Sequence, residues 1–106
     1  MLTSIAYCIT WLLVIILPMR YNILITRRAK KQLHSLPLTV QERIAEAIGT
    51  LGNNPDNPAL NVKALINEPE AQYRLRVGNY RVKYNRDDGI KIIEVVRIGH
   101  RKDIYR

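Results

Sequence analysis

The feature that most constrains the fold is an alternating segment interrupted by Gly-Asn, residues 73–84 (YRLRVGNYRVKY). Apolar and basic residues alternate on both sides of Gly78-Asn79, which is typical of two antiparallel strands joined by a two-residue turn. Such a turn places Val77 opposite Tyr80 and fixes the register of the whole pair. The segment therefore predicts a hairpin with two chemically different faces.

One face of the predicted hairpin is apolar and can cover helices. It carries Tyr73, Leu75, Val77, Tyr80, Val82 and Tyr84. On the other face Arg76 lies opposite Arg81, and Arg74 lies opposite Lys83. Because like charges directly opposite each other are destabilising, we expect that loss of Arg81 would not lower stability.

Two interpretations of this basic face remain open. Edge strands often carry Lys and Arg, so one interpretation is a solvated surface that resists aggregation. Together with Arg97 and Arg101 further along, the set is better explained as an anion-binding surface. A preorganised group of cations is also what phosphoryl transfer requires, since charge on the non-bridging oxygens grows toward the transition state.

The charge of the whole chain favours a polyanionic partner. There are 17 Lys and Arg against 9 Asp and Glu, a net charge of +8, and none of these residues precedes Arg20. A charge distributed so unevenly indicates nucleic acid or an acidic protein as partner. The only cysteine, Cys8, excludes an internal disulfide and fits a reducing compartment, so we expect a cytoplasmic protein. No His or Cys spacing typical of a metal site is present, and we expect no metal and no cofactor.

Upstream of the hairpin, the periodicity predicts a strand and two helices. Residues 21–26 are short, β-branched and apolar, as in a strand. Thr26 can cap a helix over residues 27–36, which Pro37 ends. A second helix follows, with Thr39 and Glu42 at the spacing of a capping box and Gly52 where a left-handed C-cap belongs. Its apolar stripe comprises Val40, Ile44, Ala47, Ile48 and Leu51.

Beyond the second helix, residues 53–58 are predicted to form a loop and residues 59–71 an irregular segment. After the hairpin, residues 86–89 turn the chain into a strand over residues 90–98, apolar enough to be central. The predicted order is β-α-α-β-β-β. This order indicates an α+β fold, with a twisted antiparallel sheet and two helices packed on one face.

The first eighteen residues (MLTSIAYCITWLLVIILP) are apolar, uncharged and excluded from the predicted fold. They are short for a membrane span, which needs about 20 apolar residues. They also lack the basic region and the cleavage site of a secretory signal. A third interpretation is that translation starts at Met19. We expect a single domain over residues 19–106 and no stable membrane association.

The hairpin and the C-terminal segment together resemble a known family. The run from Tyr73 to Tyr84, followed by residues 96–105 (VRIGHRKDIY), resembles the RelE branch of the RelE/ParE toxin superfamily. Residues 21–33 are similar to the first strand and helix of that family. The resemblance covers residues 19–106. It implies a toxin of a type II toxin–antitoxin system that cleaves mRNA on the ribosome without a metal and so inhibits translation.

The resemblance also implies partners and site residues. The implied partners are an acidic, helical antitoxin of the RelB kind, the ribosome with its mRNA, and operator DNA bound through the antitoxin complex. The family's catalytic positions correspond here to Arg74, Arg76, Arg81, Arg101 and Tyr105. Lys83, Arg97 and Lys102 are expected to contact RNA.

One departure from the family concerns proton transfer. RelE-type toxins can carry lysines where this chain has Arg74 and Arg76. Arginine stays protonated and cannot act as a general base. His100, adjacent to Arg101, is the nearby side chain with an ordinary pKa near neutrality, so it is a candidate acid or base. The alternative is that His100 only follows a glycine in a surface turn.

Two further functions stay open. The first is a ParE-like toxin, which shares the fold and much of the hairpin but inhibits DNA gyrase without cutting RNA. Arg101 and Tyr105 in the closing segment favour the RelE-like function over this one. The second is an inactive toxin that serves only to bind the antitoxin or the operator.

Overall fold

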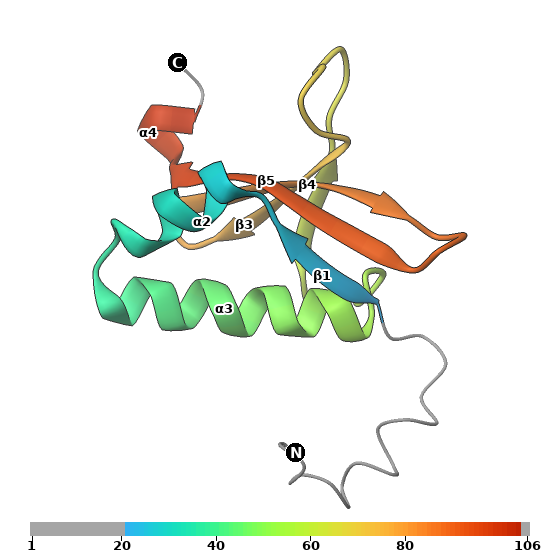
Figure 1. The fold of residues 1–106 in the computed structure, drawn as a ribbon, viewed down its shortest axis with the longest axis horizontal. Coiled ribbons are helices and arrows are strands. Elements are labelled where there is room, and N and C mark those ends of the chain that lie inside the picture. Colours follow the sequence, from blue (N-terminus) through green and yellow to red (C-terminus); the bar gives the residue numbers. More distant parts are fainter. Residues whose placement is uncertain (1–20, 105–106) are drawn as a thin grey trace, which may run out of the picture.

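A single five-stranded sheet organises residues 21–104, the part of the chain that this computed structural model describes. In chain order the elements are β1 (Asn22–Ile25), α2 (Arg27–His34), α3 (Leu38–Asn53), β2 (Asn61–Ala64), β3 (Tyr73–Val77), β4 (Tyr80–Asp87), β5 (Ile92–His100) and α4 (Arg101–Ile104). Figure 1 shows α3 along one face of the sheet, with α4 and the β2–β3 loop on the other side. The α+β class is confirmed. The segment 1–18 and Tyr105 lie outside the described residues.

The sheet differs from the predicted one in two respects. Its order is β1-β5-β4-β3-β2, and β1 pairs with β5 in parallel, so the sheet is mixed and not wholly antiparallel. Strand direction depends on how α2 and α3 return the chain to the sheet, which a local pattern does not record. The segment predicted to be irregular also contains β2, which pairs with β3 from Asn61 to Ala64. Four residues with mostly exposed side chains are too few to give a strand signal.

The predicted hairpin register is confirmed residue by residue. Val77 pairs with Tyr80, Arg76 with Arg81, and the pairing continues to Tyr73 with Tyr84. Gly78 has a φ of 59°, a left-handed conformation that a first turn residue without a side chain adopts at no steric cost. The turn therefore determines which side chains of β3 and β4 share a face.

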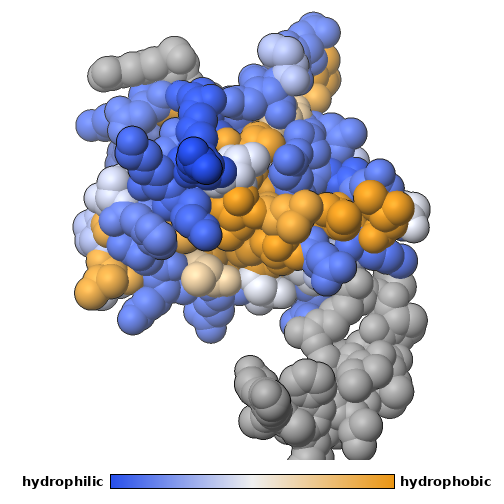
Figure 2. Space-filling model, viewed as in Figure 1, coloured by the Kyte–Doolittle hydropathy of each residue, from blue (hydrophilic) through white to orange (hydrophobic). Residues whose placement is uncertain are grey.

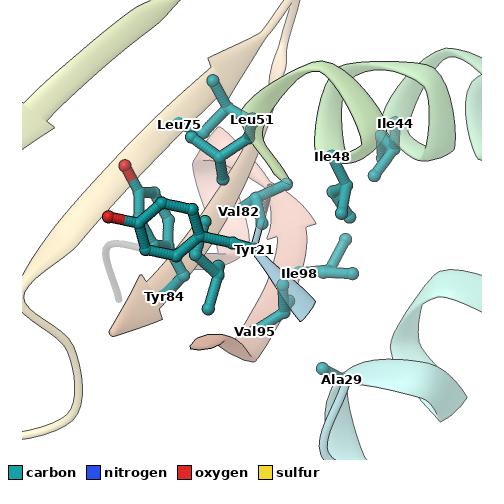
Figure 3. Close-up of a cluster of buried hydrophobic side chains, with 11 residues drawn as sticks. Tyr21, Ala29, Ile44, Ile48, Leu51, Leu75, Val82, Tyr84, Val95 and Ile98 are labelled. Atoms are coloured by element: carbon teal, nitrogen blue, oxygen red, sulfur yellow. The ribbon is translucent and has the colours of Figure 1, made fainter. Parts of the chain in front are cut away.

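The core lies between α3 and the apolar face of the sheet. Ile44, Ile48 and Leu51 of the predicted stripe are buried, with Val40 and Ala47 packed beside them. Figure 3 shows Ile44, Ile48 and Leu51 on the side of α3 that faces the buried sheet residues, Val82 among them. The confirmed stripe thus fixes α3 on the face opposite the basic residues.

Both ends of α3 differ from the prediction. The helix begins at Leu38 after Pro37, and no side chain caps it, so the predicted capping box of Thr39 and Glu42 is wrong. Gly52 is not a left-handed cap either, because the helix continues to Asn53. A Cβ built on Gly52 would lie 3.0 Å from Ile23 Cδ1, and the Tyr21 amide donates to the Gly52 carbonyl at 2.7 Å. Gly52 therefore permits close approach of β1 to α3.

Beyond the end of β1, the helix α2 lies along β5 and contacts the part of that strand that β1 does not pair with. Thr26 caps α2 as predicted, its hydroxyl accepting from the Ala29 amide at 3.1 Å. The helix is two residues shorter than predicted and ends at His34. Gln32 reaches back to β5, where its Oε1 accepts from the Ile98 amide at 2.9 Å. A side chain thus satisfies a strand amide beyond the end of β1.

A cluster around Arg86 joins the far end of β4 to two loops. Arg86 contacts Asp56 at 2.9 Å and Asp88 at 2.8 Å, and the Tyr21 hydroxyl donates to Asp88 at 2.7 Å. Hydrogen bonds from Arg86 lower the pKa of both carboxyl groups. The cluster holds the segment after α3, the β4–β5 turn and the start of β1 together.

The side of the molecule that presents β1 is partly apolar. Figure 2 shows a hydrophobic band across this view, between hydrophilic regions. Exposed large apolar side chains include Leu24 on β1 and Ile90 in the β4–β5 turn, 51% and 65% accessible. Among residues 21–104, no helix is both long and apolar enough to cross a membrane.

The two threonines at the predicted helix starts provide a matched test of capping. Thr26→Ala removes an observed cap and is expected to lower the free energy of unfolding by about 1 kcal/mol. Thr39→Ala removes a predicted cap that the structure lacks, so its effect is expected to stay within about 0.5 kcal/mol. Urea unfolding of both variants measures the difference. Equal losses would contradict this assignment of the caps.

The Arg86 cluster predicts a specific loss of stability in acid. Carboxyl groups whose pKa is lowered by folding contribute stability above their unfolded pKa, near 3.9 for Asp, and lose it as the pH falls through the folded pKa. Thermal unfolding between pH 7 and pH 2 is therefore expected to show a steeper acid loss in the parent than in Arg86→Leu, which lacks the partner of Asp56 and Asp88. Parallel curves would show that the cluster does not couple protonation to folding.

Candidate nucleic-acid interface

The basic residues of the hairpin lie on the face of the sheet turned away from α3, here called the outer face. The observed register confirms that Arg76 lies opposite Arg81 and Arg74 opposite Lys83. The next strand adds Arg97, which pairs with Lys83. The outer face is defined by five side chains on three adjacent strands: Arg74, Arg76, Arg81, Lys83 and Arg97.

Access to these cations differs sharply along the face. Arg76 is exposed, whereas Arg81 and Lys83 are buried, with only 5% and 4% of their surface accessible. Arg74 is half-buried, and its guanidinium lies 3.5 Å from Asn61 Oδ1. The face is therefore partly covered, which the alternation of the sequence did not predict.

Arg81 has a structural role in the turn. Its Nη1 donates to the carbonyl oxygens of Gly78 and Tyr80, each at 3.0 Å. Its Nε is buried and has no hydrogen-bond partner in the part of the chain that the structure describes. Removing the side chain would leave two carbonyl acceptors without this donor, at a cost of about 1 kcal/mol or more. The expectation that loss of Arg81 would not lower stability is therefore revised.

The short helix α4 folds over the outer face and brings Arg101 to the hairpin turn. The Arg101 amide donates to the Asn79 carbonyl at 2.8 Å. Ile104 is buried, and its Cδ1 lies 3.7 Å from the position of a Cβ on Gly99, which pairs with Arg81. Ile104 therefore packs beside Gly99, on the strand next to Arg81. Figure 1 shows α4 on this side of the sheet.

The structure places the remaining predicted site residues differently. The side chains of Arg101 and Lys102 are exposed. His100 pairs with Tyr80, and their rings meet edge to face at a centroid distance of 5.3 Å. Because Tyr80 belongs to the apolar face, this register directs His100 away from Arg81. Its Nδ1 accepts from the Lys102 amide at 3.1 Å.

Two glutamates that the sequence analysis missed lie against the outer face. They belong to the segment between β2 and β3, where Glu68 Oε1 is 3.5 Å from Lys83 Nζ. Glu70 contacts Arg28 of α2 at 2.9 Å and Arg97 at 3.6 Å. The available signal was the position of two acids just before a basic strand. Without a predicted path for residues 59–71, this signal could not be placed in space.

Asn85 fixes this segment on the sheet. Its Oδ1 accepts from the Gln72 amide at 2.8 Å, and its Nδ2 donates to the Glu70 carbonyl at 3.3 Å. The Gln72 side chain in turn accepts from the Arg86 amide at 2.9 Å. These three hydrogen bonds hold the segment that carries Glu68 and Glu70 in place next to the outer face.

The arrangement can bind a phosphodiester and stabilise added negative charge on it. Guanidinium groups hold two phosphate oxygens at once, and partly buried cations act more strongly than exposed ones. No group of three His, Cys, Asp or Glu side chains with metal-binding geometry occurs within the described residues.

Comparison with known proteins identifies the family. The family described as "ParE toxin of type II toxin-antitoxin system, parDE" matches residues 23–105. Toxin RelG of Mycobacterium tuberculosis is 36% identical over 89 residues, which cover 83% of this chain and 99% of that protein. Toxin RelE of the same organism is 36% identical over 87 residues, covering 81% and 87%.

Among solved structures, the archaeal RelE–RelB complex from Pyrococcus horikoshii OT3 superposes with a TM-score of 0.67 and 29% identity. The match covers 80% of this chain and 99% of the compared chain. This chain therefore shares its fold with a known group of toxins. The chain belongs to the RelE/ParE toxin superfamily of type II toxin–antitoxin systems.

Proposed function

We propose that this toxin is an endoribonuclease that cleaves mRNA on the ribosome and thereby inhibits translation. The observation that carries the proposal is the outer face, where cations from three strands converge and α4 adds Arg101 beside the hairpin turn. Such a surface suits a substrate with several phosphates in a row. The identity to proteins named RelE and RelG toxins supports the same function.

In the proposed reaction the ribose 2′-oxygen attacks the adjacent phosphorus, and the bond from phosphorus to the 5′-oxygen breaks. Arg76 and Arg101 are exposed and contact the non-bridging oxygens, with Arg74 and Arg81 behind them. Their charge stabilises the transition state without a metal ion. Lys83, Arg97 and Lys102 contact neighbouring phosphates, and Tyr105 stacks on or orients a nucleotide.

Proton transfer needs a group other than arginine. A role for His100 as acid or base requires its ring to leave Tyr80 and turn toward the outer face. His100 therefore stays a candidate that depends on rearrangement of the segment around α4.

The proposed partners follow from the same surface and from the relatives. An acidic, helical antitoxin would neutralise the toxin, as RelB accompanies RelE in the archaeal complex. The ribosome with its mRNA is the proposed target, and operator DNA is bound through the antitoxin complex. We also propose a cytoplasmic location, because the proposed target, the ribosome, is in the cytoplasm.

A second candidate function is inhibition of DNA gyrase without RNA cleavage. It is favoured by the description of the matching family, which names ParE toxins. The two functions differ in the molecule that is damaged, so one experiment in cells separates them.

Induction of the parent and of Arg76→Ala in cells, with transcript ends mapped, tests the proposal. Arg76 is chosen because it is exposed, so its loss leaves the core and the turn intact. The parent is expected to create new transcript ends inside translated reading frames. Arg76→Ala is expected to cleave at least about 100-fold more slowly than the parent. Lys30→Ala, an exposed cation on α2, is the control for charge and is expected to cleave like the parent.

DNA damage without new transcript ends would favour the gyrase function instead. An equal loss of cleavage rate in Arg76→Ala and Lys30→Ala would show that cleavage depends on the net charge of the protein and not on the outer face.

A further inference from the structure

We propose that the β2–β3 segment is an acidic gate, in which Glu68 and Glu70 occupy cations of the outer face that RNA phosphates must reach. The inference rests on the proposed function, since it concerns how RNA gains access to that face. It adds a regulatory contact built into the toxin itself, independent of any antitoxin.

The first contact of the gate lies at the centre of the outer face. Lys83 is flanked by Arg74 on β3 and by Arg97 on β5. Its side chain is only 5% exposed, and Glu68 Oε1 lies 3.5 Å from its ammonium group. A phosphate cannot approach this lysine closely while the carboxylate remains in place, because both compete for the same few donors.

The second contact extends the gate to the next strand and to α2. One carboxylate oxygen of Glu70 lies 2.9 Å from Arg28, and the other lies 3.6 Å from Arg97. Glu70 thereby neutralises a cation of the outer face and ties it to a helix outside the sheet. Two of the five cations that define the outer face are thus paired with acids of one segment.

The gate is built so that phosphate can displace it. The contacts with Lys83 and Arg97, at 3.5 and 3.6 Å, are longer than the roughly 2.7–2.9 Å of strong charged hydrogen bonds. Both carboxylates are about a quarter exposed, at 28% and 25%, so water can solvate them once they are released. The base of the segment is held by Asn85 and can stay fixed while the carboxylates rotate away.

Displacement of an internal carboxylate has a measurable consequence for RNA binding. When a phosphate takes its place, the freed carboxylate attracts a cation from solution, which offsets part of the counterion release that drives binding. Removing the carboxylate should therefore strengthen binding and make it more dependent on salt, by up to about 0.7 in the slope of log K against log salt for each freed cation.

The test uses the purified full chain and a short single-stranded RNA with every ribose 2′-O-methylated, so that binding occurs without cleavage. Fluorescence anisotropy at about 0.15 M KCl compares the parent with Glu68→Gln, Glu70→Gln and Glu94→Gln. The first two are expected to bind about 2- to 5-fold more tightly, the range of a single partly exposed ion pair. Thermal unfolding verifies that all four proteins are folded.

Glu94→Gln is the matched control for charge. Glu94 is an exposed acid on β5 opposite Asn85, and it makes no ion pair within the described part of the chain. Its effect is expected to be less than about 1.5-fold, because Glu94 is paired with neither Lys83 nor Arg97 and an exposed charge without a close partner is largely screened at this ionic strength.

A readout without RNA tests the contact itself. Acetylation of Lys83 by a lysine-reactive ester, mapped by mass spectrometry, is expected to be faster in Glu68→Gln than in the parent, and equal rates would contradict the ion pair. If RNA binds all four proteins alike, or binds Glu68→Gln and Glu70→Gln more weakly than the parent, the gate is wrong and the proposed function stands. If none of the proteins binds this RNA but the parent cleaves ribosome-bound mRNA, the gate is wrong and the proposed function stands. If the parent neither binds this RNA nor cleaves ribosome-bound mRNA, both fail.

Discussion

The two-residue turn at Gly78 and Asn79 determines how the sheet divides its side chains between the core and the outer face. Because Gly78 adopts a φ of 59°, β3 and β4 pair with one register only, and that register separates the apolar from the basic side chains. A shift by one residue would turn the cations toward α3 and the core residues toward solvent. The stability of the core and the position of the candidate site are therefore consequences of the same turn, which Arg81 and the Arg101 amide also hold.

The outer face is not left as a bare set of like charges. At one end Ile104 of α4 packs beside Gly99, the strand partner of Arg81, and toward the other the β2–β3 segment sets Glu68 against Lys83. The Glu68 carboxylate offsets part of the repulsion between the opposed cations, and Arg76 stays exposed. The proposed RNA-binding surface is thus basic but has a limited open area, which would suit a target that presents RNA in a fixed geometry.

Sequence reasoning succeeded where the signal was local. The hairpin register followed from alternation around a short turn, and the face of α3 followed from a stripe that includes Ile44 and Ile48. It failed where the cause was distant in the chain. The need for glycine at position 52 follows from the close approach of Ile23. The parallel direction of β1 follows from the path of the two helices after it. At the candidate site, the cations were predictable, but the burial of Arg81 and the two glutamates depended on segments without a repeating pattern.

We propose that the outer face promotes attack of a ribose 2′-oxygen on the adjacent phosphate. The most direct measurement is cleavage by the purified toxin of ribosome-bound mRNA that carries a single 2′-deoxynucleotide at the position cut in the all-ribose strand. We expect the all-ribose strand to be cut to leave a 2′,3′-cyclic phosphate and the 2′-deoxy position not to be cut. Cleavage at the 2′-deoxy position, or no cleavage of either strand, would contradict it.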